Sequence, residues 1–356
     1  MGPPTRGSDL QLVTPVALDA MGGDHAPREP VEAAVRAVRE LNIPVALVGR
    51  QSEIDALIRA LGGPFDRLSV IDAPEVVGMG DHAVAAVRRK PSNSISVAME
   101  AVRDGTACAA VSAGHSGAVV AAALFTLGRL PHVERPAIGV VFPTFSGGRV
   151  LLIDAGAVVD ARTSHLVQFA TLATIYLRHV VGVEHPRVGL LSNGEEPGKG
   201  NSLVRDTFAR LSVARDVNFI GNVEGNAIAS GTADAVVCDG FTGNVVLKTA
   251  EGVVGLVQAG LRAELSARWY RKVLAAPIRG SLRRAARRLD YREYGGAPLL
   301  GVRGVVVIAH GRSDSTAIRN AIAGAYLAAR SDLIGALGRG LEAGHAEEAD
   351  QADHPQ

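Results

Sequence analysis

The sequence predicts an α/β fold in which a mostly parallel sheet is covered by helices on both faces. Short apolar runs alternate with longer helical patterns along most of the 356 residues, and many of these runs end in Gly, Asp, Ser or Asn. With 47% hydrophobic and 21% charged residues, the chain can bury a sizeable core. Alternation of this kind is typical of βα units, whose ligands bind beyond the carboxyl ends of the strands.

The apolar runs are rich in Val, Ile, Leu and Ala, as expected of strands that are buried on both faces. In chain order, the expected strands are Val16–Ala20, Val45–Val48, Leu68–Ile71, Ala109–Val111, Ile138–Phe142, Val150–Ile153, Val188–Leu191, Val217–Ile220, Ala235–Cys238 and Val305–Ile308. The helical patterns repeat their apolar residues at helical spacing. They are Pro30–Leu41, Ser52–Leu61, Ser94–Val102, Thr163–His179, Ser202–Leu211, Asn244–Leu261 and Ser315–Ala329.

The stretch Gly105–Gly128 contains no charged residue and is long enough to span a bilayer. The polar loop Ser112–Gly117 interrupts it, however, and hydrocarbon does not tolerate such a loop without partners. We therefore expect a buried strand, a loop and then a helix over Ala118–Leu127, rather than a transmembrane segment.

The domain organisation expected is one elaborated catalytic domain over residues 16–340, with a second lobe from the middle of the chain as the alternative. Residues 1–15 carry no signal-peptide pattern, and we expect them to form a disordered tail. Residues 341–356 are acidic without Lys or Arg, and we expect a second disordered tail there.

Composition excludes several classes of function. Lys and Arg number 37 against 36 Asp and Glu, so no global basic field exists for nucleic acid. Aromatic residues make up only 4%, which argues against platforms that stack bases or sugars. Two cysteines cannot build a disulfide framework, so we expect a soluble protein of a reducing compartment.

Glycine-rich loops follow many of the expected strands and carry the candidate binding residues. Glycine lets backbone N–H groups approach an anion, and the N-terminus of the next helix adds positive partial charge. Tight βα turns also need glycine for structural reasons alone. Several such loops at one sheet edge nevertheless predict a phosphate-type site, whose candidates are Asp19, Gly22, Gly23, Asp24, His25, Ser112, Gly114, Asp154, Gly156, Gly198, Asn201, Asp239, Gly240, Thr242, Gly243 and Asn244.

Lys199 is the candidate catalytic residue, since it is the one lysine inside these loops. The loop Gly194–Asn201 resembles a P-loop, but only three residues separate its first glycine from Gly198, and the Ser or Thr that would bind magnesium is missing. Nucleotide hydrolysis is therefore disfavoured. The alternative is an ordinary solvated lysine.

Other catalytic signatures are missing from the sequence. No dinucleotide fingerprint and no nucleophile elbow follows a strand. Cys108 and Cys238 lie in apolar runs, where buried and unreactive thiols are expected. No histidine pair has the helical spacing of metal ligands, so we expect neither a metal nor a cofactor.

Four motifs make the sequence resemble the bacterial phosphate acyltransferase family (PlsX). They are Asp-Ala-Met-Gly-Gly-Asp-His-Ala-Pro from Asp19, Gly-Glu-Glu-Pro-Gly-Lys-Gly-Asn from Gly194, Asp-Gly-Phe-Thr-Gly-Asn-Val-Val-Leu-Lys from Asp239 and Tyr-Gly-Gly-Ala-Pro-Leu-Leu-Gly from Tyr294. The match runs from about Val16 to about Leu337. The sequence departs from the family's usual pattern at His115, Ser116 and Val158.

The resemblance implies an α/β/α Rossmann-like fold related to phosphotransacetylases and isocitrate-dehydrogenase-like enzymes. It implies an enzyme that converts fatty acyl-acyl-carrier protein and inorganic phosphate into acyl-phosphate, early in phospholipid synthesis. It further implies a homodimer in the cytoplasm and a glycerol-3-phosphate acyltransferase downstream. Phosphate is already an anionic nucleophile and a thiol leaves readily, so the reaction needs no triad or metal, only an anion site that stabilises an oxyanion.

A basic segment lies between residues 261 and 290, with a net charge of +7 against −6 for the rest of the chain. Leu261, Leu265, Trp269 and Val273 recur at four-residue spacing beside Arg268, Arg271 and Lys272. Such a basic amphipathic segment predicts peripheral binding to the inner face of the membrane, or docking of the acidic carrier protein. The alternative is a solvated basic face whose apolar stripe lies in the core or the dimer interface.

Two other functions compete with the acyltransferase. One is a soluble short-chain phosphotransacylase or a dehydrogenase-like enzyme on the same fold, against which the basic segment and the missing fingerprint argue. The other is a non-catalytic membrane-surface scaffold for acyl carrier protein, which leaves the glycine-rich loops unexplained.

Overall fold

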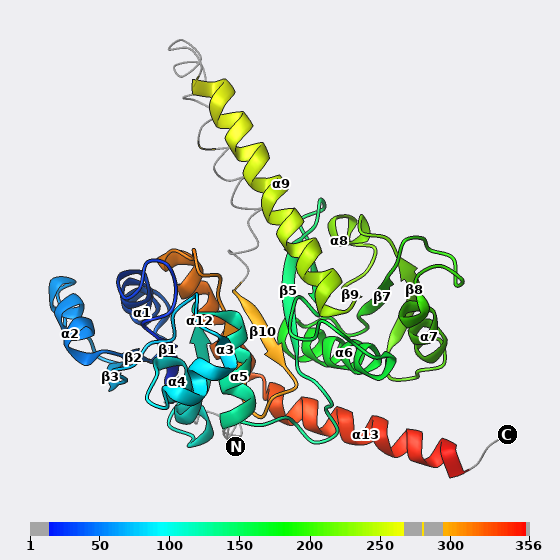
Figure 1. The fold of residues 1–356 in the computed structure, drawn as a ribbon, viewed down its shortest axis with the longest axis horizontal. Coiled ribbons are helices and arrows are strands. Elements are labelled where there is room, and N and C mark those ends of the chain that lie inside the picture. Colours follow the sequence, from blue (N-terminus) through cyan, green and yellow to red (C-terminus); the bar gives the residue numbers. More distant parts are fainter. Residues whose placement is uncertain (1–13, 267–279, 281–294, 354–356) are drawn as a thin grey trace, which may run out of the picture. The chain divides into compact units, whose positions relative to one another are not determined.

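The structure is a computed structural model that describes residues 14–266, 280 and 295–353 (Figure 1). Its residues form two compact units. Unit 1 comprises residues 1–130 and 302–335, and unit 2 comprises residues 131–301 and 336–356. Each unit has its own sheet strands and buried core. The single elaborated domain expected over residues 16–340, with a second lobe as its alternative, stays a prediction.

The sheet of unit 1 is parallel, with the strand order β3-β2-β1-β4-β11. Its central strands are buried at every residue, and successive side chains point to opposite faces, so both faces are covered. The bounds are β1 Val16–Asp19, β2 Val45–Gly49, β3 Leu68–Asp72, β4 Ala109–Ser112 and β11 Val305–Ile308.

The helices of unit 1 pack in two groups. In one group α1 packs on α12, and in the other α3 and α4 pack on α5. Asn93 caps α4 and Asp314 caps α12, each by accepting a backbone N–H bond. The bounds are α1 Arg28–Leu41, α2 Gln51–Ala60, α3 Ala83–Arg89, α4 Ser94–Arg103, α5 Ser116–Thr126 and α12 Ser315–Arg330.

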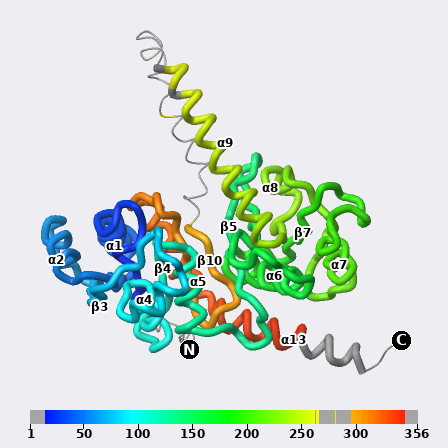
Figure 2. The backbone as a smooth tube through the Cα atoms, in the orientation of Figure 1, coloured from blue at the N-terminus to red at the C-terminus, as the bar shows by residue number. Residues whose placement is uncertain are grey.

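The strands of unit 2 run in the order β10-β5-β6-β9-β7-β8. β10 and β6 are antiparallel to β5, whereas β6, β9, β7 and β8 are parallel to one another. Figure 2 shows β10 beside β5, although these strands are far apart in the chain. The bounds are β5 Ala137–Pro143, β6 Arg149–Ile153, β7 Arg187–Leu191, β8 Asn218–Val223, β9 Ala235–Val237 and β10 Ala297–Leu300.

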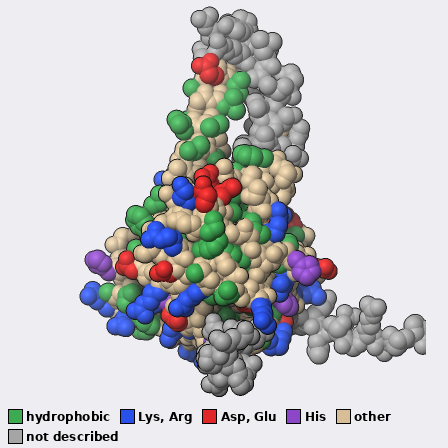
Figure 3. All heavy atoms as spheres, turned by 90° about the vertical axis from the view of Figure 1, so that its right-hand side faces the viewer, with side chains coloured by type: hydrophobic (Ala, Val, Ile, Leu, Met, Phe, Trp, Pro, Cys, Tyr) green, Lys and Arg blue, Asp and Glu red, His purple; other side chains and the backbone are tan. Residues whose placement is uncertain are grey.

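The helices of unit 2 cover this sheet, and one of them also projects from it. α6 Thr163–Tyr176 packs on β6 and β9 and continues as the π-helical turn Leu177–Val181, while α7 Ser202–Leu211 packs on α6. The short α8 Ala227–Ser230 lies near β5 and β6. α9 Gly240–Ser266 contacts β6 at its beginning, and its later turns extend away from the unit (Figures 1 and 3).

The predicted fold class is confirmed, and each predicted strand and helix lies on an observed one. The strand β10 was missed. It is short, contains Pro298 and pairs antiparallel, so it lacks the long apolar run that marks the parallel strands. The short helices α3 and α8 were missed as well.

The structure describes the two predicted tails to different extents. Residues 1–13 lie outside the described residues. The acidic tail expected to be disordered over residues 341–356 is instead helical as far as Asp353, as part of α13 Leu333–Asp353. Leu333, Leu337 and Leu341 are buried at four-residue spacing, and the Ala and Glu residues that follow are strong helix formers.

Gly105–Gly128 forms the expected strand, loop and helix, namely β4, Ala113–His115 and α5. Within the described part of the chain, no helix is long and apolar enough to cross a membrane.

Candidate active site

In unit 1 the candidate residues meet where β1 and β4 end side by side. Asp19 is the last residue of β1 and Ser112 the last of β4. The Ser112 hydroxyl donates to the Asp19 carboxylate over 2.7 Å and accepts from the N–H of Gly114 over 3.0 Å. Asp19 also accepts the N–H of Met21 over 3.0 Å. These bonds tie the loop after β1 to the loop after β4.

Asp19 and Ser112 face inward, and each is only 1% exposed. Burial raises the pKa of the Asp19 carboxyl, while hydrogen bonds from Ser112 and Ser94 oppose that rise. Gly22 packs directly against the Asp19 carboxylate and the backbone nitrogen of Gly114. In this structure Asp19 and Ser112 therefore shape the loops from beneath.

The outer part of the unit 1 loops is exposed. Gly23 is half-buried, and the side chains of Asp24 and His25 face solvent. Asp24 Oδ2 lies 4.0 Å from Arg312 Nε, and its backbone N–H donates to Gly311 O over 2.7 Å. His115 caps α5 by accepting the N–H of Ala118, so this departure from the family pattern has a local structural role.

In unit 2 a second buried carboxylate, Asp154, directly follows β6. It accepts the backbone N–H groups of Ile138, Gly156, Ala157 and Val158 over 2.7–3.1 Å. Burial raises the pKa of this carboxyl, and the four backbone donors oppose that rise. The loop Asp154–Val158 is therefore folded around its own aspartate. Val158, another departure from the family pattern, contributes through its backbone.

The motif from Asp239 forms the start of α9 rather than a loop. Asp239 caps the helix by accepting the backbone N–H of Thr242 over 2.9 Å and its hydroxyl over 2.7 Å. A Cβ on Gly243 would collide with the carbonyl oxygen of Asp154, so only glycine allows this close approach. Gly240 lies against Asp154 and Val158, and Asn244 lies beside Gly156.

Lys199 lies in the loop between β7 and α7. The side chain of Asn193 accepts the N–H of Gly200 over 2.9 Å, and Asn201 caps α7 by accepting the N–H of Val204 over 2.9 Å. Gly198 and Lys199 are exposed. Among the residues that the structure describes, none forms a hydrogen bond or an ion pair with the Lys199 ammonium. Its charge is therefore available to a ligand.

Unit 2 therefore brings three of the predicted loops to one edge. β6, β9 and β7 are parallel neighbours, so the residues that follow them, from Asp154, Cys238 and Ser192, leave the sheet at the same edge. The N-terminus of α9 and that of α7 begin at this edge as well. Helix N-termini, glycine-rich backbone and one lysine together favour an anion.

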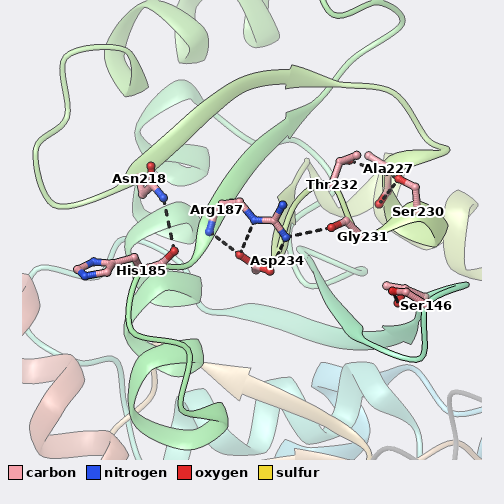
Figure 4. A network of polar contacts seen from close by, with 10 residues as sticks. Ser146, His185, Arg187, Asn218, Ala227, Ser230, Gly231, Thr232 and Asp234 are labelled. Carbon is pink, nitrogen blue, oxygen red and sulfur yellow. Dashed lines mark hydrogen bonds and ion pairs between the residues drawn. The ribbon is translucent and has the colours of Figure 1, made fainter.

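The opposite edge of this sheet carries a different polar network (Figure 4). Arg187 and Asp234 lie where β7 and β9 begin and form a bidentate pair with two contacts of 3.0 Å. Arg187 also donates to Gly231 O over 3.0 Å, and Asn218 donates to His185 O over 3.4 Å. This network joins strand beginnings, so we assign it a structural role.

The two cysteine thiols are protonated, and the described residues form no group of metal ligands. Cys238 is buried and its pKa is raised well above the ordinary value by burial, which keeps it a thiol. Cys108 is half-buried just before β4, where burial raises its pKa to about 11. Among the described residues no group of three His, Cys, Asp or Glu side chains is placed to hold a metal ion.

The predicted membrane or carrier-protein surface is only partly visible. Leu265 lies in α9 and is half-buried. Trp269, Val273, Arg268, Arg271 and Lys272 lie outside the described residues. Sequence reasoning missed Asn222, a buried side chain beneath the Lys199 loop; its only signal was the glycine-rich stretch Gly221–Gly225.

Solved structures with this fold are phosphotransacetylases and related enzymes. A phosphotransacetylase from Staphylococcus aureus matches with a TM-score of 0.59 and 16% identity over 89% of this chain and 94% of the other. One from Streptococcus pyogenes matches with a TM-score of 0.58 and 17% identity over the same shares. The chain therefore has the α/β/α fold of the phosphotransacetylases.

The sequence comparisons give the family. Residues 14–335 match the family described as "Fatty acid synthesis protein". A phosphate acyltransferase from Desulforudis audaxviator is 48% identical over 92% of this chain and 96% of its own length. Another, from Trichlorobacter lovleyi, is 48% identical over 86% of this chain and 88% of its own length. The chain belongs to this family, whose relatives named here are phosphate acyltransferases.

Proposed function

We propose that this chain transfers a fatty acyl group from the thioester of an acyl carrier protein to inorganic phosphate. The observation that carries the proposal is the exposed Lys199 in a glycine-rich loop at the sheet edge where α7 and α9 begin. The names of the relatives support phosphate as the acceptor. The same edge of the unit 2 sheet holds the loops that follow β6 and β9.

The reaction forms one bond and breaks one. A phosphate oxygen attacks the thioester carbonyl carbon, a C–O bond forms, and the tetrahedral oxyanion collapses as the C–S bond breaks. The thiolate leaves and takes a proton from solvent, so that acyl-phosphate and the free carrier thiol are the products. Lys199 and backbone N–H groups hold the phosphate and stabilise negative charge that develops on the carbonyl oxygen.

The proposal extends to partners and location. We propose a cytoplasmic homodimer that takes acyl carrier protein and phosphate as substrates and delivers acyl-phosphate to a glycerol-3-phosphate acyltransferase. We also propose peripheral association with the inner face of the membrane. Two features support this: the +7 charge of residues 261–290, and the exposed apolar residues Val253, Leu256, Val257 and Leu261 on the projecting part of α9 (Figure 3).

The direct test is to incubate the protein with palmitoyl-acyl carrier protein and phosphate and to measure acyl-phosphate as its hydroxamate, together with released thiol. We expect both products to appear in a one-to-one ratio and only when phosphate is present. Acetyl-coenzyme A in a parallel reaction tests for a short-chain phosphotransacylase. Thiol release without phosphate, or turnover of acetyl-coenzyme A alone, would contradict the proposal.

A further inference from the structure

One backbone carbonyl, that of Glu196, organises the Lys199 loop. It accepts the N–H of Lys199 over 3.0 Å and so closes a turn over residues 196–199. Pro197 and Gly198 occupy the middle of this turn, where proline presets the backbone and glycine adapts to it. The same carbonyl also accepts the side-chain amide of Asn222 over 2.9 Å. Asn222 therefore holds the atom that positions the backbone of Lys199.

Asn222 belongs to β8 and is buried, with only 4% of its surface exposed. Its Oδ1 has no hydrogen-bond partner in the part of the chain that the structure describes. Burying an amide with an unpaired oxygen is unfavourable, and an apolar side chain of similar size would avoid that cost. Among the described residues, the side-chain amide of Asn222 donates one hydrogen bond, and its acceptor lies in the Lys199 turn.

The side chain of Lys199 depends on the same turn. Its Cγ lies 2.9 Å from the position that a Cβ on Gly194 would take, so the lysine stem folds over the backbone of Gly194. The exposed ammonium then has its place set by the loop rather than by partners of its own. A shift of the Glu196 carbonyl would move Lys199 relative to a bound anion.

We infer that Asn222 is a positioning residue for Lys199, acting through the Glu196 carbonyl; this inference rests on the proposed function. It predicts that Asn222 contributes to the use of phosphate and not to the binding of the acyl donor. The inference also predicts that Asn222 contributes only when Lys199 is present.

The test replaces Asn222 with leucine, which keeps the volume and removes both the donor and the unpaired oxygen. We expect N222L to keep its Tm within a few degrees, to lose about 10–100-fold in kcat/KM for phosphate, and to keep its KM for the acyl donor. N222Q, which retains the amide, should recover part of the loss. The matched control is N218L, on the same strand, whose amide donates to His185 O at the opposite edge (Figure 4); we expect it to remain active.

A double-mutant cycle and an activity-independent measurement complete the test. In a K199A background N222L should cause no further loss, because the lysine that it positions is gone. Amide hydrogen exchange at Lys199 should be faster in N222L than in the wild type, whether or not the protein turns over. Equal losses in both backgrounds, or unchanged exchange, would overturn the inference. A wild type that makes no acyl-phosphate would instead overturn the proposed function, and exchange would still decide the role of Asn222.

Discussion

A lysine ammonium on a protein surface binds an anion weakly unless the backbone around it holds the same anion. The loop of Lys199 is fixed by Asn193, Asn201 and Asn222, while the ammonium group itself stays exposed. Asp19 and Asp154 differ from Lys199 because their side chains are buried. Each is a buried carboxylate at a strand end that accepts a hydrogen bond from the backbone of the loop that follows it, and this helps to fix the shape of that loop.

For a single residue, we predict the effect of Lys199→Ala on catalysis and on stability. Removing the charge should lower kcat/KM by about 10²–10³-fold, the loss seen for one oxyanion-type donor. The Tm should stay within a few degrees, since an exposed loop lysine contributes little packing. Steady-state kinetics and thermal melts check both statements. K248A is the matched control, because Lys248 is exposed on α9 and paired with Glu251; a fully active K199A would show that the site lies elsewhere.

At the scale of the element, α9 depends on how closely its first turn approaches β6. Gly243→Ala would push a Cβ into the Asp154 carbonyl and should destabilise the protein by about 1–3 kcal/mol or prevent folding. Gly252 lies on the same helix with open space around it. Gly252→Ala should therefore stabilise by up to about 1 kcal/mol. Urea denaturation compares the two, and equal effects would contradict the packing described here.

The Arg187–Asp234 pair joins the beginnings of β7 and β9, away from the Lys199 loop. Partial burial acts to raise the pKa of Asp234, but hydrogen bonds and charge from Arg187 outweigh it and hold that pKa below its ordinary value. The folded state therefore binds protons less readily than the unfolded state. The pair's stabilisation is present at neutral pH and is lost as pH falls through the acidic range.

Asp234→Ala should cost about 1 kcal/mol at neutral pH, because the pair is partly exposed and screened. The difference from the wild type should shrink as pH falls towards the pKa of Asp234. Denaturation midpoints at neutral and acidic pH measure this. Activity per folded molecule should be unchanged, and a loss of turnover without a loss of stability would show that this edge of the sheet takes part in the reaction.

For the molecule as a whole, the net charge is only +1, but residues 261–290 alone carry a net charge of +7. Attraction to an anionic bilayer is about 1 kcal/mol per basic residue near its surface and weakens as salt rises. Apolar contacts add a part that resists salt; Leu256, 73% exposed on α9, is one candidate.

We expect the protein to co-sediment with vesicles that contain phosphatidylglycerol at low salt, and partly to dissociate at high salt. Replacing Leu265, Trp269 and Val273 together by Ser should leave the protein in the supernatant while it still turns over dissolved substrate. A wild type that never sediments, or a triple variant that unfolds, would place the apolar stripe in the core or in a dimer interface.

The fold class, nearly all of the strands and the loops that carry the candidate site could be predicted from the sequence. Parallel strands buried on both faces need continuous apolar runs, and tight turns after them need glycine, so both leave strong local signals in the sequence. Four long motifs made the family recognisable as well. The Lys199 loop was predicted as a candidate site in this way, from its glycines and its single lysine.

Which side chains are buried and which distant residues are in contact became clear only from the three-dimensional structure. Asp19 and Ser112 end different strands and bond to each other, and β10 pairs with β5 although these strands are far apart in the chain. The motif from Asp239 begins a helix because its aspartate caps Thr242 and its Gly243 fits against Asp154. Asn222, which lies in β8, and Lys199, which lies in the loop after β7, both donate to the carbonyl oxygen of Glu196. Such contacts join residues distant in sequence, so no local spacing or composition encodes them.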